Sequence, residues 1–201
     1  MSKPPTYTVD WFTNNLPLWT QLFQSYNKRP VNFLEVGTYE GRSAIWALEN
    51  ILQHPESKIT CVDNWKTPGT FQRFKKNISS NPAFKGKVNI FKGAARDSLK
   101  HPTILQQQYD VIYIDADLHS ASVMEHAVLA FPLLKPGGLL IFDDYTYSMQ
   151  RDNRCPKQAI DAFINAYAED IRVITARWQV VIQKRKHPRA RKPCRSEFYS
   201  F

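Results

Sequence analysis

Residues 33–43 read FLEVGTYEGRS, and our interpretation of the whole chain starts from them. The first four residues are mostly apolar, as in a buried strand, and the residues from Gly41 onward have the pattern of a helix. Gly37 allows the backbone to turn sharply, and Gly41 allows a ligand to approach the start of the helix without a Cβ in the way. Free N–H groups at a helix start favour a negatively charged group such as a carboxylate. The stretch therefore predicts a ligand-binding turn between a strand and a helix.

The alternation of strands and helices continues to residue 184. Strands are predicted at 31–36, 58–63, 88–91, 109–115, 139–142, 171–175 and 178–183, and helices at 41–52, 70–78, 120–134 and 156–168. Pro136 and the two glycines after it are predicted to turn the chain before the fifth strand. Only a tight turn separates the last two strands, so this pair must be antiparallel. We therefore predict an α/β, Rossmann-like fold with a seven-stranded, mostly parallel sheet, an antiparallel last strand and helices on both faces.

Three regions are predicted along the 201 residues. Residues 1–30 form an N-terminal helical extension, 31–184 form one domain, and 185–201 form a basic C-terminal tail. In the extension, aromatic and leucine residues suit one or two amphipathic helices, with Pro17 opening the second. The apolar residues of the extension either pack against the main domain or serve as a lid over a substrate pocket or as a contact in a homodimer.

The composition limits the partners and the compartment. The net charge is +9, which favours an anionic partner such as a nucleic acid, an acidic glycan or a phosphorylated small molecule. The three cysteines are far apart and lack metal-ligand spacing, so we expect reduced thiols. No stretch approaches the ~18 apolar residues of a membrane span. We expect a cytoplasmic protein with no membrane partner.

Two acidic residues near the opening turn indicate an adenosine-containing ligand. Asp63 ends the second predicted strand, where an acidic residue in Rossmann-like folds accepts hydrogen bonds from ribose hydroxyls. Glu35 lies just before the turn, where it would be poorly placed beside a pyrophosphate but would suit a cationic amine, such as that of S-adenosylmethionine. The spacing is not G-x-G-x-x-G, and the sheet ends in an antiparallel pair. Both features disfavour a nicotinamide oxidoreductase.

The segment EVGTYEGRS (35–43) resembles motif I of the class I S-adenosylmethionine-dependent methyltransferases, in the form E-x-G-T-x-x-G-x-S found in O-methyltransferases. The resemblance implies that the loop contacts the methionyl group, that Ser43 binds its carboxylate and that Asp63 holds the ribose. It also implies that Asn64 and Trp65 lie near the adenosine and that Ala94 and Ala95 border the adenine. The implied cofactor-binding set is Glu35, Gly37, Thr38, Tyr39, Gly41, Ser43, Asp63, Asn64, Trp65, Ala94, Ala95 and Asp115.

Three aspartates follow the fourth and fifth predicted strands. Asp115 ends the fourth strand, and Asp143 and Asp144 follow the fifth, so all three are expected at the carboxyl edge of the sheet. Carboxylates that converge repel one another unless a cation or a proton intervenes. Hard oxygen ligands of this kind suit Mg²⁺ or another divalent cation. Helix capping or hydrogen bonding within the loop is the alternative role of the Asp143–Asp144 pair.

The segments IDADLH (114–119) and LLKPGGLLIFDDY (133–145) resemble a family of small O-methyltransferases, some of which modify sugars, with the pattern IDGSH…LLKxGG…DDY. The resemblance covers about residues 31–184. It implies that Asp115, Asp143 and Asp144 bind a metal or the substrate, that Asp115 and Asp144 are catalytic, and that His119 is a candidate base. The chain departs from the family at His119, which lies four residues after Asp115 instead of three. Either the loop shifts by one residue, or His119 is a partly exposed histidine at a helix start.

These features predict an S-adenosylmethionine-dependent O-methyltransferase acting on a small molecule or sugar, with or without a divalent metal. Arg151, Arg154 and Lys157 near the predicted site either bind an anionic substrate or are solvated. The alternative is an RNA-binding protein or an RNA ribose methyltransferase that uses the basic tail. The chain lacks the Asn/Asp-Pro-Pro-Tyr/Phe motif of enzymes that methylate base amino groups.

Overall fold

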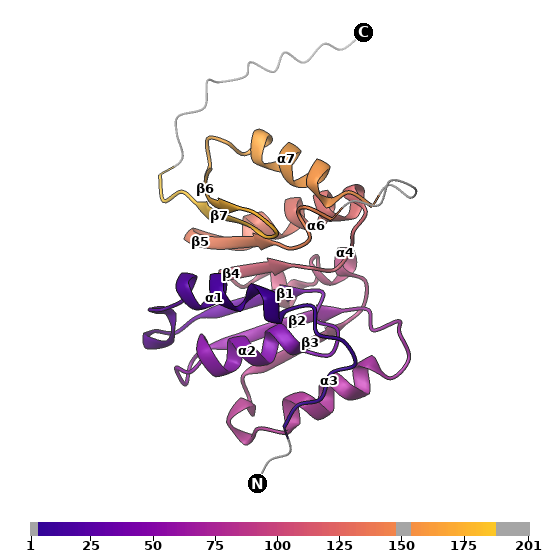
Figure 1. Cartoon of the computed structure of the whole chain (residues 1–201). Coiled ribbons are helices and arrows are strands. Elements are labelled where there is room, and N and C mark those ends of the chain that lie inside the picture. Colours follow the sequence, from indigo (N-terminus) through magenta and orange to yellow (C-terminus); the bar gives the residue numbers. More distant parts are fainter. Residues whose placement is uncertain (1–3, 148–153, 188–201) are drawn as a thin grey trace.

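A seven-stranded sheet forms the centre of the computed structural model, which describes residues 4–147 and 154–187. The strands are β1 (Asn32–Val36), β2 (Lys58–Asp63), β3 (Val88–Lys92), β4 (Tyr109–Ile114), β5 (Leu134–Phe142), β6 (Ile171–Ala176) and β7 (Val180–Lys184). Their order in the sheet is β3-β2-β1-β4-β5-β7-β6 (Figure 1). Strands β1 to β5 pair in parallel, and β7 is antiparallel to both of its neighbours. The predicted fold is confirmed.

Helices connect the strands. The α-helices are α1 (Leu16–Leu22), α2 (Arg42–Asn50), α3 (Thr70–Ser79), α4 (Ala95–Ser98), α5 (Pro102–Leu105), α6 (Ser120–Ala130) and α7 (Pro156–Ala166). Short 3-10 helices lie at Thr13–Asn15, Tyr26–Lys28, Pro82–Phe84 and Phe131–Leu133. Within the described residues, no helix is both long and apolar enough to span a membrane.

Both faces of the sheet are covered, which explains why the central strands are almost continuously apolar. In β4, Val111 and Tyr113 face the core that includes side chains of α1, α2 and α3. Ile112 and Ile114 face the opposite core, to which α6 and α7 contribute. Successive side chains of β4 therefore enter the two cores in turn.

Several element ends differ from the sequence-based prediction, and three of these differences have a structural reason or consequence. Pro136 and the glycines after it do not turn the chain but lie inside β5, which already begins at Leu134. The pairing of β4 with β5 is irregular between Tyr109 and Val111, and such irregular pairing tolerates a residue without an N–H. The helix predicted to reach residue 134 ends at Ala130, because Pro132 follows in a 3-10 turn. The last strand starts at Val180, so residues 178 and 179 belong to the β6–β7 turn.

Phe12, Trp19 and Phe23 of the N-terminal segment pack against the main domain, as one of the alternatives predicted, whereas Trp11 is exposed. Trp19 is fully buried and Phe12 is 4% exposed. The Trp19 ring contacts Tyr113 of β4 edge-on at a centroid distance of 5.0 Å. Helix α1 is therefore part of the core on this face of the sheet. The division at residue 30, the dimer contact and the lid stay predictions. Arg151 and the tail from residue 188 lie outside the described residues.

Candidate active site

The turn after β1 is held by close packing. Gly37 has φ +99° and donates its N–H to the carbonyl of Val62 at 2.8 Å. A Cβ at Gly37 would lie 2.2 Å from the carbonyl oxygen of Asp115, so only glycine fits between the ends of β1 and β4. At Gly41, a Cβ would lie 2.8 Å from the Phe74 ring. A side chain of α3 therefore occupies the space into which a Cβ on Gly41 would point, and the approach of a ligand at Gly41 stays a prediction.

Glu35 lies beneath this turn and is completely buried. The Ser43 hydroxyl donates to Glu35 Oε1, and the Cys61 thiol lies 3.9 Å from Oε2. Burial raises the pKa of Glu35 to about 8, although the Ser43 hydrogen bond acts in the opposite direction. Glu35 and Ser43 are thus bonded to each other in this structure. Their predicted contacts with the amine and carboxylate of the cofactor stay predictions.

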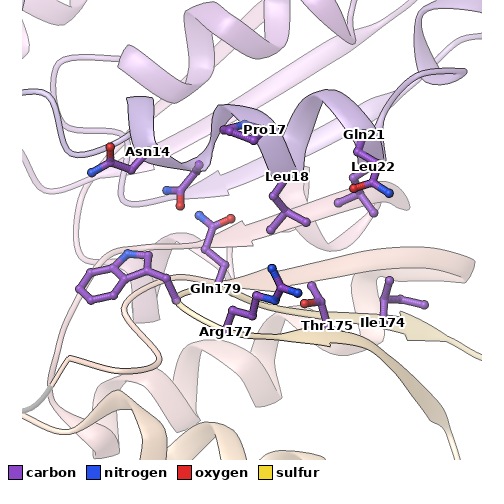
Figure 2. A pocket seen from close by; sticks show the side chains of 11 residues that line it. Asn14, Pro17, Leu18, Gln21, Leu22, Ile174, Thr175, Arg177 and Gln179 are labelled. Atoms are coloured by element: carbon purple, nitrogen blue, oxygen red, sulfur yellow. The ribbon is translucent and has the colours of Figure 1, made fainter.

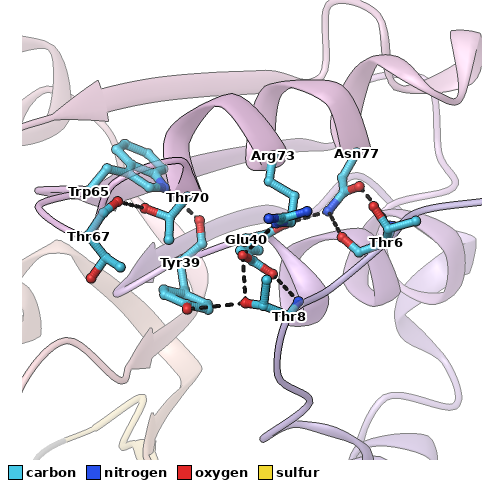
Figure 3. Close-up of polar contacts among 9 residues, drawn as sticks. All are labelled: Thr6, Thr8, Tyr39, Glu40, Trp65, Thr67, Thr70, Arg73 and Asn77. Atoms are coloured by element: carbon cyan, nitrogen blue, oxygen red, sulfur yellow. Dashed lines mark hydrogen bonds and ion pairs between the residues drawn. The ribbon is translucent and has the colours of Figure 1, made fainter.

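Asp63 ties the first turn to the loop after β2. Its carboxylate accepts the N–H of Tyr39 at 2.7 Å and that of Trp65 at 2.6 Å. The indole N–H of Trp65 in turn donates to the carbonyl oxygen of Tyr39 at 2.5 Å (Figure 3). Three predicted cofactor-binding residues therefore form one unit.

Backbone strain also gathers at this edge. Among the described residues, Tyr39 (φ +49°), Trp65 (φ +44°) and Asp144 (φ +56°) are the non-glycine residues with positive φ. Such conformations cost free energy and are common at binding sites, where the surroundings enforce them. All three residues belong to the predicted site.

Thr38 and the predicted adenine contacts complete the cofactor set. Thr38 is 2% exposed, and its hydroxyl lies close enough to Glu35 to act against the rise in the pKa of that carboxyl. Ala94 is the residue before α4, and the N–H of Gly93 donates to the carbonyl of Asp63 at 2.9 Å. The loop after β3 therefore adjoins the end of β2, while Asn64 is exposed. The roles of these residues toward adenosine stay predictions.

A second network near the turn was missed by the sequence analysis. Glu40 is 2% exposed and accepts the Thr8 N–H at 2.6 Å and the Arg73 guanidinium N–H at 2.7 Å. Asn77 exchanges hydrogen bonds with the backbone of Thr6 (Figure 3). These contacts fasten the N-terminal segment and α3 to the cofactor turn. They join residues more than 30 positions apart, so no local sequence signal indicates them.

Tyr113 lies between two of the three aspartates. Its hydroxyl donates to Asp143 Oδ2 and lies 3.1 Å from Asp115 Oδ2. A phenol has one proton, so both contacts are hydrogen bonds at once only if a carboxyl group supplies another. Burial raises the pKa of Tyr113 well above its usual value, with the charges of Asp115 and Asp143 adding to the rise. Tyr113 is therefore a hydrogen-bond donor to this cluster and not a base.

The three aspartates disturb one another's ionisation. The pKa of Asp115 is raised well above its usual value. The main cause is the dense protein around its carboxyl group, and the charges of Asp143 and Asp144 add to the rise. Asp115 is open to solvent at the sheet edge, so water screens part of this effect. Burial and the charge of Asp143 raise the pKa of Asp144 to about 6. The sheet edge therefore concentrates negative charge, as predicted.

The aspartates do not form a closed metal centre. Within residues 4–147 and 154–187, no three His, Cys, Asp or Glu side chains are grouped as metal ligands. Asp143 already accepts the amide N–H of Gln179 at 2.9 Å and of Asn15 at 3.4 Å, as well as the backbone N–H of Asp144. The alternative of hydrogen bonding within the loop is thus realised at Asp143. The chemistry of the donors still suits a hard divalent cation, whose charge would relieve the repulsion.

Gln179 and Trp19 extend this network into the core, and the sequence analysis assigned a role to neither. The Trp19 indole N–H donates to Gln179 Oε1 at 2.8 Å, and Gln179 is 1% exposed. A buried chain of hydrogen bonds therefore runs from α1 through the β6–β7 turn to Asp143. The one sequence signal was a glutamine at the start of an apolar strand.

His119 lies immediately before α6, at its N-cap. Its Nδ1 pairs with Asp117 Oδ1 at 2.8 Å, and its side chain is 52% exposed. The position matches the partly exposed histidine at a helix start, and the contact with Asp117 leaves Nε2 available. Whether His119 acts as a base stays a prediction.

The basic residues near the predicted site do not all remain available for an anion. Lys157 pairs with Asp161 at 2.5 Å and donates to the Tyr145 hydroxyl at 2.8 Å. Arg154 forms a β-bridge with His119 through its backbone. Lys157 is therefore occupied by its own helix and neighbouring loop, and it is a poor candidate for substrate binding.

Comparison with known proteins now identifies the family. A family model described as a methyltransferase domain matches residues 34–145, which is more than half of the chain. The chain belongs to this methyltransferase family. The matched residues run from β1 to the end of the aspartate cluster, so they include both halves of the site. The domain is therefore a methyltransferase domain, as the motifs predicted.

Relatives of this methyltransferase are distant. A curated uncharacterised protein of Acanthamoeba polyphaga mimivirus is 26% identical over 153 residues, which span 75% of this chain and 65% of that protein, just under two thirds of its length. An O-methyltransferase from Bacillus cereus, solved with SAH, has a TM-score of 0.68 at 21% identity and covers 89% of this chain and 84% of its own. The O-methyltransferase NovP has a TM-score of 0.66 at 19% identity, and the match covers 85% of this chain and 79% of NovP. MycE of the mycinamycin pathway was solved with Mg, SAH and mycinamycin VI. It has a TM-score of 0.63 at 15% identity, and the match covers 91% of this chain and 51% of MycE. These structures share the fold of this methyltransferase.

Proposed function

We propose that the protein transfers the methyl group of S-adenosylmethionine to a hydroxyl group of a small molecule or sugar. One observation carries the proposal: the cofactor turn and the aspartate cluster meet at the backbone contact between Gly37 and Asp115. A cofactor held by the turn would therefore present its methyl group beside the carboxylates. Two of the solved structures with this fold are named O-methyltransferases, and MycE was solved with mycinamycin VI.

The proposed reaction is a direct displacement. A lone pair of the acceptor oxygen forms the new O–CH₃ bond while the S–CH₃ bond breaks, and its electron pair neutralises the sulfonium. The acceptor hydroxyl loses its proton to a base, for which we propose His119, held by Asp117. Asp115 and Asp144 would orient the hydroxyl and favour its loss of a proton. Because the sulfonium loses charge, alignment of the reacting atoms supplies much of the rate.

We also propose that Asp115, Asp143 and Asp144 hold a divalent cation. Burial, and after it the repulsion among the carboxylates, raises the pKa values of Asp115 and Asp144, and a bound cation would offset that repulsion. The hard oxygen chemistry of the three side chains also supports this assignment. MycE, which has the same fold, was solved with Mg. A bound cation would lower the pKa of the acceptor hydroxyl.

Calorimetry and a turnover assay test the proposal. We expect binding of S-adenosylmethionine and SAH but not of NAD, and Asp63→Ala should weaken cofactor binding at least about tenfold, or ~1.4 kcal/mol. Asp115→Ala should abolish methyl transfer while SAH affinity changes little. Failure of the protein to bind either form of the cofactor would refute the proposal. Normal turnover by Asp115→Ala would show that the catalytic edge is wrongly assigned.

The RNA alternative rests on the net charge and on a basic tail. Most of that tail, from residue 188 onward, lies outside the described residues. RNA binding therefore stays a prediction from the sequence.

A further inference from the structure

A groove of about 680 Å³ lies between α1 and the β6–β7 hairpin (Figure 2). Pro17, Leu18 and Leu22 of α1 form one wall. The other wall is formed by the hairpin, with Ile174 and Arg177 facing the helix across the groove. This volume is within the range of pockets that enclose a small organic ligand, about 300–1,000 Å³.

Two residues that line the groove also contact the aspartate cluster. Asn15 and Gln179 line the groove, and both are buried. The amide groups of these same two residues donate to Asp143 Oδ2. A molecule in the groove would therefore be one side chain away from Asp143, whose backbone and side chain lie beside Asp144 and Tyr113. The groove therefore ends beside the edge where methyl transfer is proposed, with the side chains of Asn15 and Gln179 between it and Asp143.

The walls combine apolar surface with an uncompensated cation. Trp178 lines the groove and is 46% exposed, an unusual state for so large an aromatic side chain. Leu18 and Leu22 offer aliphatic surface on the opposite wall. The guanidinium of Arg177 makes no ion pair or hydrogen bond within the described parts of the chain. A planar, ring-shaped ligand would cover the apolar walls, and an anionic substituent would pair with Arg177.

We propose that this groove binds the methyl acceptor, and that the acceptor is a ring compound with an acidic group that pairs with Arg177. The acidic group is a carboxylate or a phosphate, which Arg177 would bind in the same bidentate way. This inference rests on the proposed methyltransferase function, to which it adds the place and the chemical class of the acceptor. It also assigns Arg177 as a specificity-determining residue.

Matched ligand pairs test the inference on the SAH-bound protein. We would measure binding of 3,4-dihydroxybenzoate against catechol, and of glucose 6-phosphate against glucose. In one of the two pairs, we expect the acidic compound to bind at least about tenfold more tightly than the neutral compound. The pair that shows this preference tells whether the acidic group is a carboxylate or a phosphate. Arg177→Gln should reduce that preference to less than about threefold and leave SAH affinity unchanged.

A second arginine provides the control. Arg172 is also exposed on β6 but does not line the groove, so Arg172→Gln changes the charge equally and should preserve the preference. Leu18→Trp, which fills the groove, should weaken binding of the preferred acid at least about tenfold without affecting SAH. The inference is wrong if the wild-type protein shows no acid preference, or if the preference survives Arg177→Gln or is lost in Arg172→Gln. Loss of SAH binding by the wild type would instead refute the proposed function itself.

Discussion

The backbone of Gly37 lies so close to that of Asp115 that a Cβ on Gly37 would be 2.2 Å from the Asp115 carbonyl oxygen. The N–H of Asp115 also donates to the carbonyl of Val36 at 2.7 Å. The turn that is predicted to hold the cofactor and the strand end that is predicted to act on the acceptor are therefore one rigid unit. The positions of the two halves of the site cannot change independently.

Replacing Gly37 with alanine should disrupt this unit. The positive φ costs about 1–2 kcal/mol for a residue with a Cβ, and the overlap with Asp115 adds about 1–3 kcal/mol. We expect a loss of about 3 kcal/mol in the free energy of unfolding, measured by urea denaturation, and a loss of SAH binding. Gly69→Ala is the control: Gly69 also has a positive φ of +84°, but a Cβ there meets nothing within 4 Å. Equal losses in the two variants would show that the contact with Asp115 is not tight.

Glu35 should make stability depend on pH. Its pKa is about 8 in the folded protein against 4.5 ordinarily, so between these values the folded state keeps a proton that the unfolded state releases. The contribution of this group to the free energy of unfolding therefore falls as the pH rises from about 4.5 to about 8. Relative to the wild type, Glu35→Gln should gain up to about 5 kcal/mol over this range, since one pKa unit corresponds to about 1.4 kcal/mol.

Urea denaturation of both proteins across that pH range provides the measurement for Glu35. Glu56→Gln, which changes an exposed glutamate, should follow the wild-type curve. A Glu35→Gln curve parallel to that of the wild type would mean that the buried carboxyl has an ordinary pKa.

Gln179→Leu should impair catalysis more than cofactor binding. The change removes a hydrogen bond from Asp143 and leaves the buried Trp19 N–H without an acceptor, at a cost of about 1–3 kcal/mol of stability. Because Asp143 is then less well held, we expect kcat to fall about tenfold, or ~1.4 kcal/mol in the barrier, with SAH affinity unchanged. Gln183→Leu, in the strand β7 that follows Gln179, removes a bond to Gly137 remote from the site and should leave kcat intact. The same kcat in both variants would argue against a role for the Gln179 network.

His119→Ala should lower kcat by a factor of about 10²–10⁴ if His119 is the base. Asp117→Asn should have a smaller effect, about tenfold, because it removes the partner that fixes the imidazole but leaves the base in place. SAH affinity should not change in either variant. His101→Ala is the matched control, since His101 also lies at a helix N-cap and is exposed. A His119→Ala variant that retains full kcat would assign the proton transfer to another group.

Removal of divalent cations by EDTA should reduce methyl transfer, and Mg²⁺ should restore it. Binding of Mg²⁺ itself should be measurable by calorimetry, and at a concentration of about 100 times its Kd it should stabilise the folded protein by about 2.7 kcal/mol. Asp115→Asn should abolish both binding and stabilisation, because it removes one of the three carboxylates. Full activity after exhaustive chelation would eliminate the proposed cation.

The sequence predicted the parts of this protein that depend on local pattern. The near-continuous apolar run of β4 indicated a strand with both faces covered, and the two cores confirm it. The turn at residues 37–41 was also predictable, because positive φ values favour glycine wherever they occur. The contact between Gly41 and Phe74 was not predictable, because the Phe74 ring comes from α3, 33 positions later in the sequence.

By itself, the sequence determined which segments form strands, that most of them are parallel, and that Asp63, Asp115, Asp143 and Asp144 follow strand ends, because these features depend on hydrophobic periodicity and on connection length. Only the tertiary structure decided which groups hold those aspartates. Asn15, Tyr113 and Gln179 come from three separate elements, and each bonds to Asp143 because packing of α1 and the β6–β7 hairpin brings them together. Hydrogen bonds of this kind depend on distances of a few ångströms between side chains far apart in the chain, which a one-dimensional pattern does not contain.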